Sequence, residues 1–260
     1  MSDVYDPPER VAAESHCRGM QKYDEMYNES IDDPKKFWSK ICQQFYWKSP
    51  IPEGKTTVAK LKHRSNSNII SDPSEFMKYN FDLRKGPIKI EWMVGAKTNI
   101  CYNALDRNVE AGLGDKIAFH WVGNDPADKG SVTYSQLLAE VCKFANVLES
   151  RGVKTGDRVA LYMPMITELV VAMLACARIG AVHSIVFGGY SADSLAMRIT
   201  DAGARVLVTA DGVFRGKKMI KLLEIANEAM EKVAKEGFTV DHHICVSHIP
   251  RLTKIGRAHV

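Results

Sequence analysis

The sequence predicts an α/β protein with a helical N-terminal region and a doubly wound, mostly parallel sheet in its C-terminal half. Between residues 134 and 247, short apolar runs alternate with amphipathic helical segments. Each connection is long enough for a crossover helix. The apolar runs are nearly continuous, which is typical of strands covered on both faces. Ligands of such sheets bind beyond the carboxyl ends of the strands.

The expected elements follow from this periodicity. The predicted strands of the parallel sheet are Arg158–Met163, Ala181–Phe187, Arg205–Thr209 and His243–Ser247. The predicted helices run from about Tyr134 to Arg151, Thr167 to Ile179, Ser191 to Ala202 and Lys217 to Glu236. Two further strands are expected earlier, at Lys116–Val122 and near Val132.

The N-terminal region is predicted to be helical between Arg10 and Trp47. Asp33 followed by Pro34 supplies an N-cap and a first-turn proline, and an apolar stripe that includes Phe37 and Trp38 follows at helical spacing. We expect that stripe to pack on a core. Residues 51–80 are polar and aperiodic, which predicts a loop.

Composition excludes several classes of protein. With 260 residues, 45% hydrophobic and 25% charged, the chain has the make-up of a globular protein. The net charge of +4 is small and dispersed, so no nucleic-acid partner is expected. The longest apolar run, Leu169 to Ala177, is too short to cross a membrane, and the first residues predict no secretory signal. The six cysteines and eight histidines show no metal-ligand spacing, so we expect reduced thiols, no metal ligands and a cytoplasmic protein.

The strand ending at Phe187 runs into Gly188, Gly189 and Tyr190, and Ser191 then stands at a helix start. Two glycines permit close approach of a ligand to the backbone, and a helix N-terminus favours an anion. The alternative is that this segment is only a tight turn between strand and helix.

A second candidate follows the next strand, where Arg215, Gly216, Lys217 and Lys218 precede a predicted helix. Cations in the first turn of a helix oppose its dipole. A bound phosphate would reverse that penalty, because the helix amides and the cationic side chains would converge on it. The alternative is a solvated basic loop.

At these residues the chain resembles the acetyl-CoA synthetases, the AMP-forming acetate–CoA ligases of the adenylate-forming superfamily. The segments that carry the resemblance are Tyr23–Pro50, Ile90–Val109 and Gly156–Ser191. It implies an N-terminal helical module at residues 1–50, a loop or insertion at 51–80, and the first part of an adenylation domain at 81–254.

The resemblance also implies a chemistry. Members of the family activate acetate with ATP, in the presence of Mg²⁺, to acetyl-adenylate and diphosphate, and coenzyme A then displaces AMP. Arg215 through Lys218 correspond to the segment that grips the coenzyme A phosphates, with Lys218 where some members have arginine. Phe187, Gly188 and Gly189 correspond to the turn beside its adenine. The alternatives are a synthetase for another short acid, such as propionate, or a non-catalytic coenzyme A-binding protein.

Two departures from the family are expected. Residues 53–75 form a stretch that the most similar members lack, and the alternatives are a lineage-specific insertion or a translated intron. The sequence ends before the family's phosphate loop, acetate pocket and C-terminal lysine, so no catalytic residue is assigned. The last six residues, 255–260, match the translation of a common sequencing adapter, and we expect the true chain to continue beyond them.

The 260 residues alone are therefore expected not to form acetyl-adenylate. Acetate-dependent exchange of labelled diphosphate into ATP measures this half-reaction directly. Exchange by the purified chain above a no-protein control would contradict the expectation.

Overall fold

The computed structural model describes residues 5–48 and 76–249. The chain forms two compact units, residues 1–98 and 99–260, and each is described by itself. Most of the predicted loop and insertion, and the 255–260 tail, lie outside the described residues.

The first unit contains α1 (Glu9–Glu14), α2 (Gly19–Asp32) and α3 (Pro34–Cys42). The expected cap is confirmed: the Asp33 side chain accepts a hydrogen bond from the Lys36 amide at 3.1 Å, and Pro34 opens α3. The apolar stripe of α3 is only partly buried, because Trp38 remains 44% exposed. The prediction that this stripe packs on a core is thus wrong for its outer residues.

The same unit contains a hairpin that the sequence did not predict. Strand β1 (Met77–Asn80) pairs antiparallel with β2 (Lys89–Trp92), and the short 3₁₀ turn η1 (Leu83–Lys85) lies between them. The predicted loop over residues 51–80 is therefore wrong at its C-terminal end. The polar composition of β1 concealed the strand, and the turn is held by the Asn80 side-chain amide, which donates to the carbonyls of Gly86 and Pro87.

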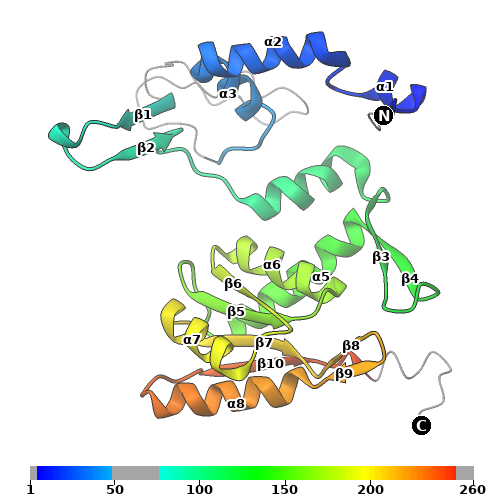
Figure 1. The fold of residues 1–260 in the computed structure, drawn as a ribbon, viewed down its shortest axis with the longest axis vertical. Coiled ribbons are helices and arrows are strands. Elements are labelled where there is room, and N and C mark those ends of the chain that lie inside the picture. Colours follow the sequence, from blue (N-terminus) through cyan, green and yellow to red (C-terminus); the bar gives the residue numbers. More distant parts are fainter. Residues whose placement is uncertain (1–4, 49–75, 250–260) are drawn as a thin grey trace. The chain divides into compact units, whose positions relative to one another are not determined.

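The second unit confirms the predicted α/β class (Figure 1). Its sheet has the strand order β10-β7-β5-β6, and all neighbours are parallel. The strands are β5 (Arg158–Met163), β6 (Val182–Phe187), β7 (Val206–Ala210) and β10 (His242–Val246). The helices are α5 (Tyr134–Ser150), α6 (Thr167–Ile179), α7 (Ala192–Ala202) and α8 (Leu222–Lys235). An antiparallel pair, β3 (Ile117–Val122) and β4 (Lys129–Thr133), precedes α5.

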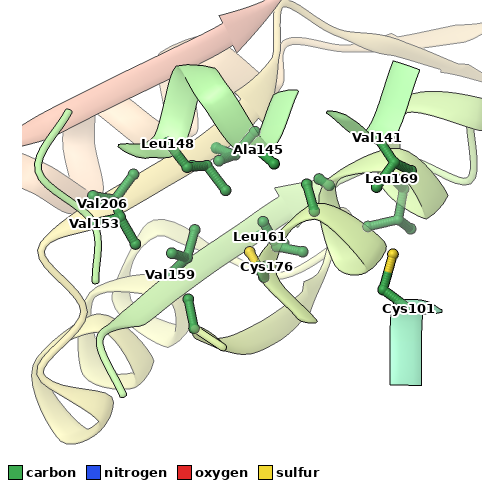
Figure 2. Close-up of a cluster of buried hydrophobic side chains, with 14 of the residues drawn as sticks. Cys101, Val141, Ala145, Leu148, Val153, Val159, Leu161, Leu169, Cys176 and Val206 are labelled. Atoms are coloured by element: carbon green, nitrogen blue, oxygen red, sulfur yellow. The ribbon is translucent and has the colours of Figure 1, made fainter. Parts of the chain in front are cut away.

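The central strands β5 and β7 are buried on both faces, whereas the edge strand β6 remains largely exposed. Val159, Leu161 and Met163 of β5 point into a core formed with α5 and α6, part of which is shown in Figure 2. Ala160 and Tyr162 point into the core formed with α7 and α8. Successive side chains of a strand alternate between faces, so one buried strand supplies both cores.

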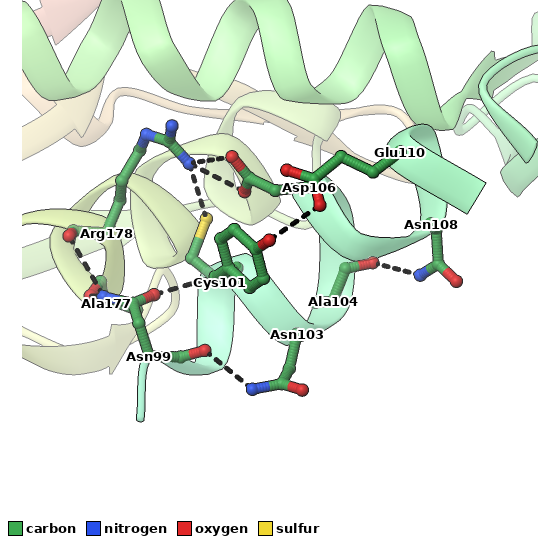
Figure 3. A network of polar contacts seen from close by, with 10 residues as sticks. Asn99, Cys101, Asn103, Ala104, Asp106, Asn108, Glu110, Ala177 and Arg178 are labelled. Carbon is green, nitrogen blue, oxygen red and sulfur yellow. Dashed lines mark hydrogen bonds and ion pairs between the residues drawn. The ribbon is translucent and has the colours of Figure 1, made fainter. Parts of the chain in front are cut away.

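A polar network ties the segment before β3 to helix α6 (Figure 3). This segment contains the π-helical turns η2 (Tyr102–Asp106) and η3 (Val109–Leu113). The Arg178 guanidinium lies 2.8 Å from an Asp106 carboxylate oxygen, and the Asn99 side-chain amide donates to the Ala177 carbonyl at 2.9 Å. The hydrogen bond to Asp106 raises the pKa of Arg178 further above its ordinary value. The network thus satisfies carbonyls at the C-terminal end of α6, where a cation is also favoured by the helix dipole.

All six cysteines are free thiols. Among the described residues, no helix is long and apolar enough to span a membrane. Within residues 5–48 and 76–249, no cluster of histidine, cysteine and acidic side chains is suited to hold a metal ion.

Replacing Arg178 should destabilise the second unit. Arg178→Ala leaves the Asp106 carboxylate, only 14% exposed, without its cation, at an expected cost of about 1–3 kcal/mol in the free energy of unfolding. Urea unfolding followed by circular dichroism measures this cost. The control is Lys143→Ala, which removes an exposed ion pair with Glu140 and should cost less than about 0.5 kcal/mol. Equal losses for the two variants would contradict the prediction.

Candidate functional site

The carboxyl ends of β6 and β7 lead into the two segments that the sequence singled out. Because the strands are parallel, these ends lie at the same edge of the sheet. The chain leaves β6 through Gly188 and Gly189 and leaves β7 through Asp211 and Gly212.

The cationic segment forms a hairpin, and the prediction that it opens a helix is wrong. β8 (Val213–Arg215) pairs antiparallel with β9 (Lys218–Ile220), and α8 begins only at Leu222. Gly216 and Lys217 form the two-residue turn, with φ of +60° at Gly216. This left-handed backbone conformation favours glycine, and glycine at the first turn position is a common hairpin signal.

The hairpin concentrates positive charge. Arg215 and Lys218 are directly opposed across the two strands, and Lys217 lies in the turn between them. All three side chains are exposed, and among the described residues none of them forms an ion pair. Like charges placed opposite each other destabilise a strand pair, and a bound anion would remove that repulsion.

The turn after β6 is built around its two glycines. A side chain at Gly188 would place its Cβ 3.3 Å from the Met163 carbonyl oxygen, and at Gly189 it would lie 2.5 Å from the Phe187 ring. Phe187 is 57% exposed, and its ring meets that of Tyr190 edge-on at 5.8 Å between centroids. The expected cap is confirmed, since Ser191 accepts a hydrogen bond from the Ser194 amide at the start of α7.

Tyr162 anchors this turn from inside the core. Its side chain is fully buried, and its hydroxyl donates to the Tyr190 carbonyl at 2.8 Å. Burial raises the pKa of the Tyr162 phenol, which therefore stays protonated and able to donate. The Arg198 guanidinium stacks on the Tyr190 ring, 4.6 Å from the ring centroid.

The two segments border one open cleft of about 630 Å³. Of the predicted site residues, Gly189, Arg215 and Lys218 line it, whereas Phe187, Gly188, Gly216 and Lys217 do not. Lys221, Glu224 and Glu228 form the α8 side. The carboxylates of Glu224 and Glu228 have cations nearby: Lys221 pairs with Glu224 at 2.8 Å, and Lys232 lies 3.4 Å from Glu228.

A second cleft, of about 450 Å³, lies between α5 and α6 and is lined mainly by apolar residues that include Met163, Val208 and Val246. Its charged residues include Glu140 and Lys143, which pair with each other at 2.7 Å. Of these two clefts in the described part of the chain, the first is the one that offers uncompensated positive charge.

Sequence reasoning missed the residues that support the cleft. In the sequence, Tyr162 has the pattern of an ordinary apolar strand residue, and nothing around Asn124 predicts a contact with the hairpin. Its side-chain amide donates to the Gly216 carbonyl at 3.1 Å and holds the hairpin turn, although 92 residues separate the two positions. Contacts of this kind depend on the tertiary fold.

Fold and cleft together define a class: a doubly wound α/β protein with a cationic site at the carboxyl ends of its strands, where such folds bind ligands. Comparison with known proteins makes the class specific. Residues 105–254 match the family model described as AMP-binding enzyme, and the chain belongs to that family. Residues 23–66 match the model described as acetyl-coenzyme A synthetase N-terminus, a match that extends past the predicted module into the predicted insertion.

Curated relatives agree with the family. The chain is 48% identical to acetyl-coenzyme A synthetase of Drosophila melanogaster, over 99% of this chain and 36% of the relative. It is 46% identical to the chloroplastic/glyoxysomal acetyl-coenzyme A synthetase of Arabidopsis thaliana, over 95% of this chain and 30% of the relative. The chain thus spans about a third of the length of these relatives.

The Tyr162 hydroxyl should make stability sensitive to alkaline pH. Because the folded-state pKa is raised, its contribution is complete below the ordinary tyrosine value of about 10 and is lost as pH rises through the raised value. Tyr162→Phe should lower the unfolding free energy at pH 7 by about 1 kcal/mol. It should also flatten the decline above pH 10.

Urea unfolding at pH 7 and across the alkaline range measures both effects. The control is Tyr79→Phe, which alters an exposed tyrosine and should change neither value. A Tyr162→Phe variant that retains the wild-type alkaline decline would show that another group causes it.

Proposed function

We propose that this chain belongs to an acetate–CoA ligase and contributes the cleft that binds the phosphates of coenzyme A. Such a ligase converts ATP, acetate and coenzyme A to acetyl-CoA, AMP and diphosphate through acetyl-adenylate. The observation that carries the proposal is the cleft that brings Gly189 together with the unpaired cations Arg215 and Lys218.

The chemistry of coenzyme A suits this cleft. Its nucleotide half carries a 3′-phosphate and a diphosphate beside an adenine ring. The Arg215 guanidinium provides the planar fork that grips a phosphate bidentately, and the Lys218 ammonium adds a point charge. The exposed Phe187 ring beside Gly189 offers an aromatic surface for the adenine.

ATP, acetate and Mg²⁺ enter the proposal through the family alone. When bound, Mg²⁺ would neutralise the phosphates of ATP during attack by the carboxylate. The described residues contain no cluster suited to the ion, so we assign it no ligand here and no catalytic residue. The cytoplasmic location is likewise part of the proposal.

Two alternatives make different predictions. A synthetase for propionate or another short acid would share the coenzyme A cleft and differ in the acyl pocket. A non-catalytic protein would bind coenzyme A without activating any acid. Diphosphate exchange with acetate and with propionate, measured on the complete gene product, separates the three.

Removing Arg215 should weaken coenzyme A binding. Titration calorimetry of the 260-residue chain with coenzyme A should show an affinity about tenfold lower for Arg215→Ala, because a charge-assisted hydrogen bond contributes roughly 1.5–3 kcal/mol. The affinity of Arg215→Lys should lie between those of wild type and Arg215→Ala, since lysine keeps the charge but lacks the planar fork of the guanidinium.

Lys235→Ala is the matched control. It removes one exposed cation from the last turn of α8, roughly 10 Å along the helix beyond Glu228, the last α8 residue that lines the cleft. We expect its affinity to stay within twofold of wild type. Equal losses for Arg215→Ala and Lys235→Ala would indicate diffuse charge attraction instead of a site, and no binding by wild type would overturn the proposal.

A further inference from the structure

Asp211 joins the end of β7 to the hairpin, and one of its carboxylate oxygens accepts three backbone hydrogen bonds. The donors are the amides of Gly212 at 2.9 Å, His248 at 2.9 Å and Ile249 at 3.0 Å. The last two lie just after β10. A charged acceptor shared by three amides is a strong local anchor.

The backbone of the same residue makes two more connections. The Asp211 amide donates to the Val246 carbonyl at 3.0 Å, and the Asp211 carbonyl accepts from the Leu223 amide at 3.2 Å. Leu223 lies in the first turn of α8, whose amides have no partner within the helix. Asp211 therefore links β7, the hairpin, the end of β10 and the start of α8.

The backbone is tightly packed at the base of the hairpin. Gly212 is buried, and a Cβ there would lie 2.8 Å from the Ile220 carbonyl oxygen and 3.3 Å from the Ile249 side chain. At the other end, Asn124 holds the turn through Gly216. The hairpin backbone is thus held at its base and at its turn, and this sets the backbone positions of Arg215 and Lys218.

We propose that Asp211 is a positioning residue for coenzyme A: its carboxylate holds the hairpin so that Arg215 and Lys218 face Gly189 across the cleft. The inference rests on the proposed function, because it assigns Asp211 a role in that same site. Asp211 touches neither cation in the structure and acts through the backbone of the hairpin.

The sign of the effect separates positioning from electrostatics. Asp211 is an anion within about 14 Å of Arg215 along the chain. Electrostatics alone predicts that its removal strengthens the binding of an anionic ligand at low ionic strength. Positioning predicts the opposite.

The test is calorimetric titration with coenzyme A at low ionic strength on the whole 260-residue chain. Asp211→Ala should bind at least tenfold more weakly than wild type. Asp211→Asn should fall between them, because its amide oxygen still accepts hydrogen bonds but carries no charge. The matched control is Asp241→Asn, which removes a carboxylate paired with Arg205 at the amino end of β10 and should stay within twofold of wild type.

Hydrogen exchange supplies a readout that does not depend on the ligand. In Asp211→Asn, amides of residues 213–220 should exchange faster than in Asp241→Asn, while those of β5 should not change. This comparison tests the role of Asp211 even if the Asp211→Ala variant fails to fold. Unchanged hairpin exchange, or coenzyme A binding by Asp211→Asn as tight as wild type or tighter, would overturn the inference. Absence of binding by wild type would instead overturn the proposed function, and hairpin exchange would still decide whether Asp211 holds the hairpin.

Discussion

Burial of β5 on both faces is the constraint on which the rest of the second unit depends. Every residue from Val159 to Met163 is buried, and alternate side chains belong to different cores. A strand in this position needs helices above and below it, so its neighbours in the sheet are parallel and joined by crossover helices. Their carboxyl ends then meet at one edge, and the chain must turn away from the core there.

The candidate site lies at this edge because the turns that follow the strands are not packed between the two cores, so their residues are free to contact a ligand. Gly188 passes close to the Met163 carbonyl, and Gly216 takes a left-handed conformation, so glycine serves geometry at both positions. The opposed cations Arg215 and Lys218 run against the usual preference for cross-strand pairs. Departures from local rules are expected where function outweighs stability, and the support comes from Tyr162, Asn124 and Asp211.

The parallel sheet was predictable because its signal is local and strong. Apolar strands and amphipathic helices repeat, and caps at Asp33 and Ser191 mark helix starts. The β1–β2 and β8–β9 hairpins were not, because strands of three or four residues carry too little periodicity, and the cations before α8 were assigned to its first turn. The site residues came from glycines, charges and resemblance. The residues that hold these segments in place could not be predicted, because hydrogen bonds such as that from Asn124 to Gly216 join residues far apart in the sequence.

The cationic segment favours an anion even though it forms a hairpin and not the start of a helix. A helix start would have supplied amides and a dipole for an anion; the hairpin supplies two opposed cations whose repulsion an anion relieves. The carboxylates Glu224 and Glu228 across the cleft already have cations nearby. Positive charge without a partner is therefore confined to one wall, and a ligand with phosphates at one end gains most when that end faces the hairpin. Under the proposed function, coenzyme A would therefore enter this cleft with its phosphates toward the hairpin.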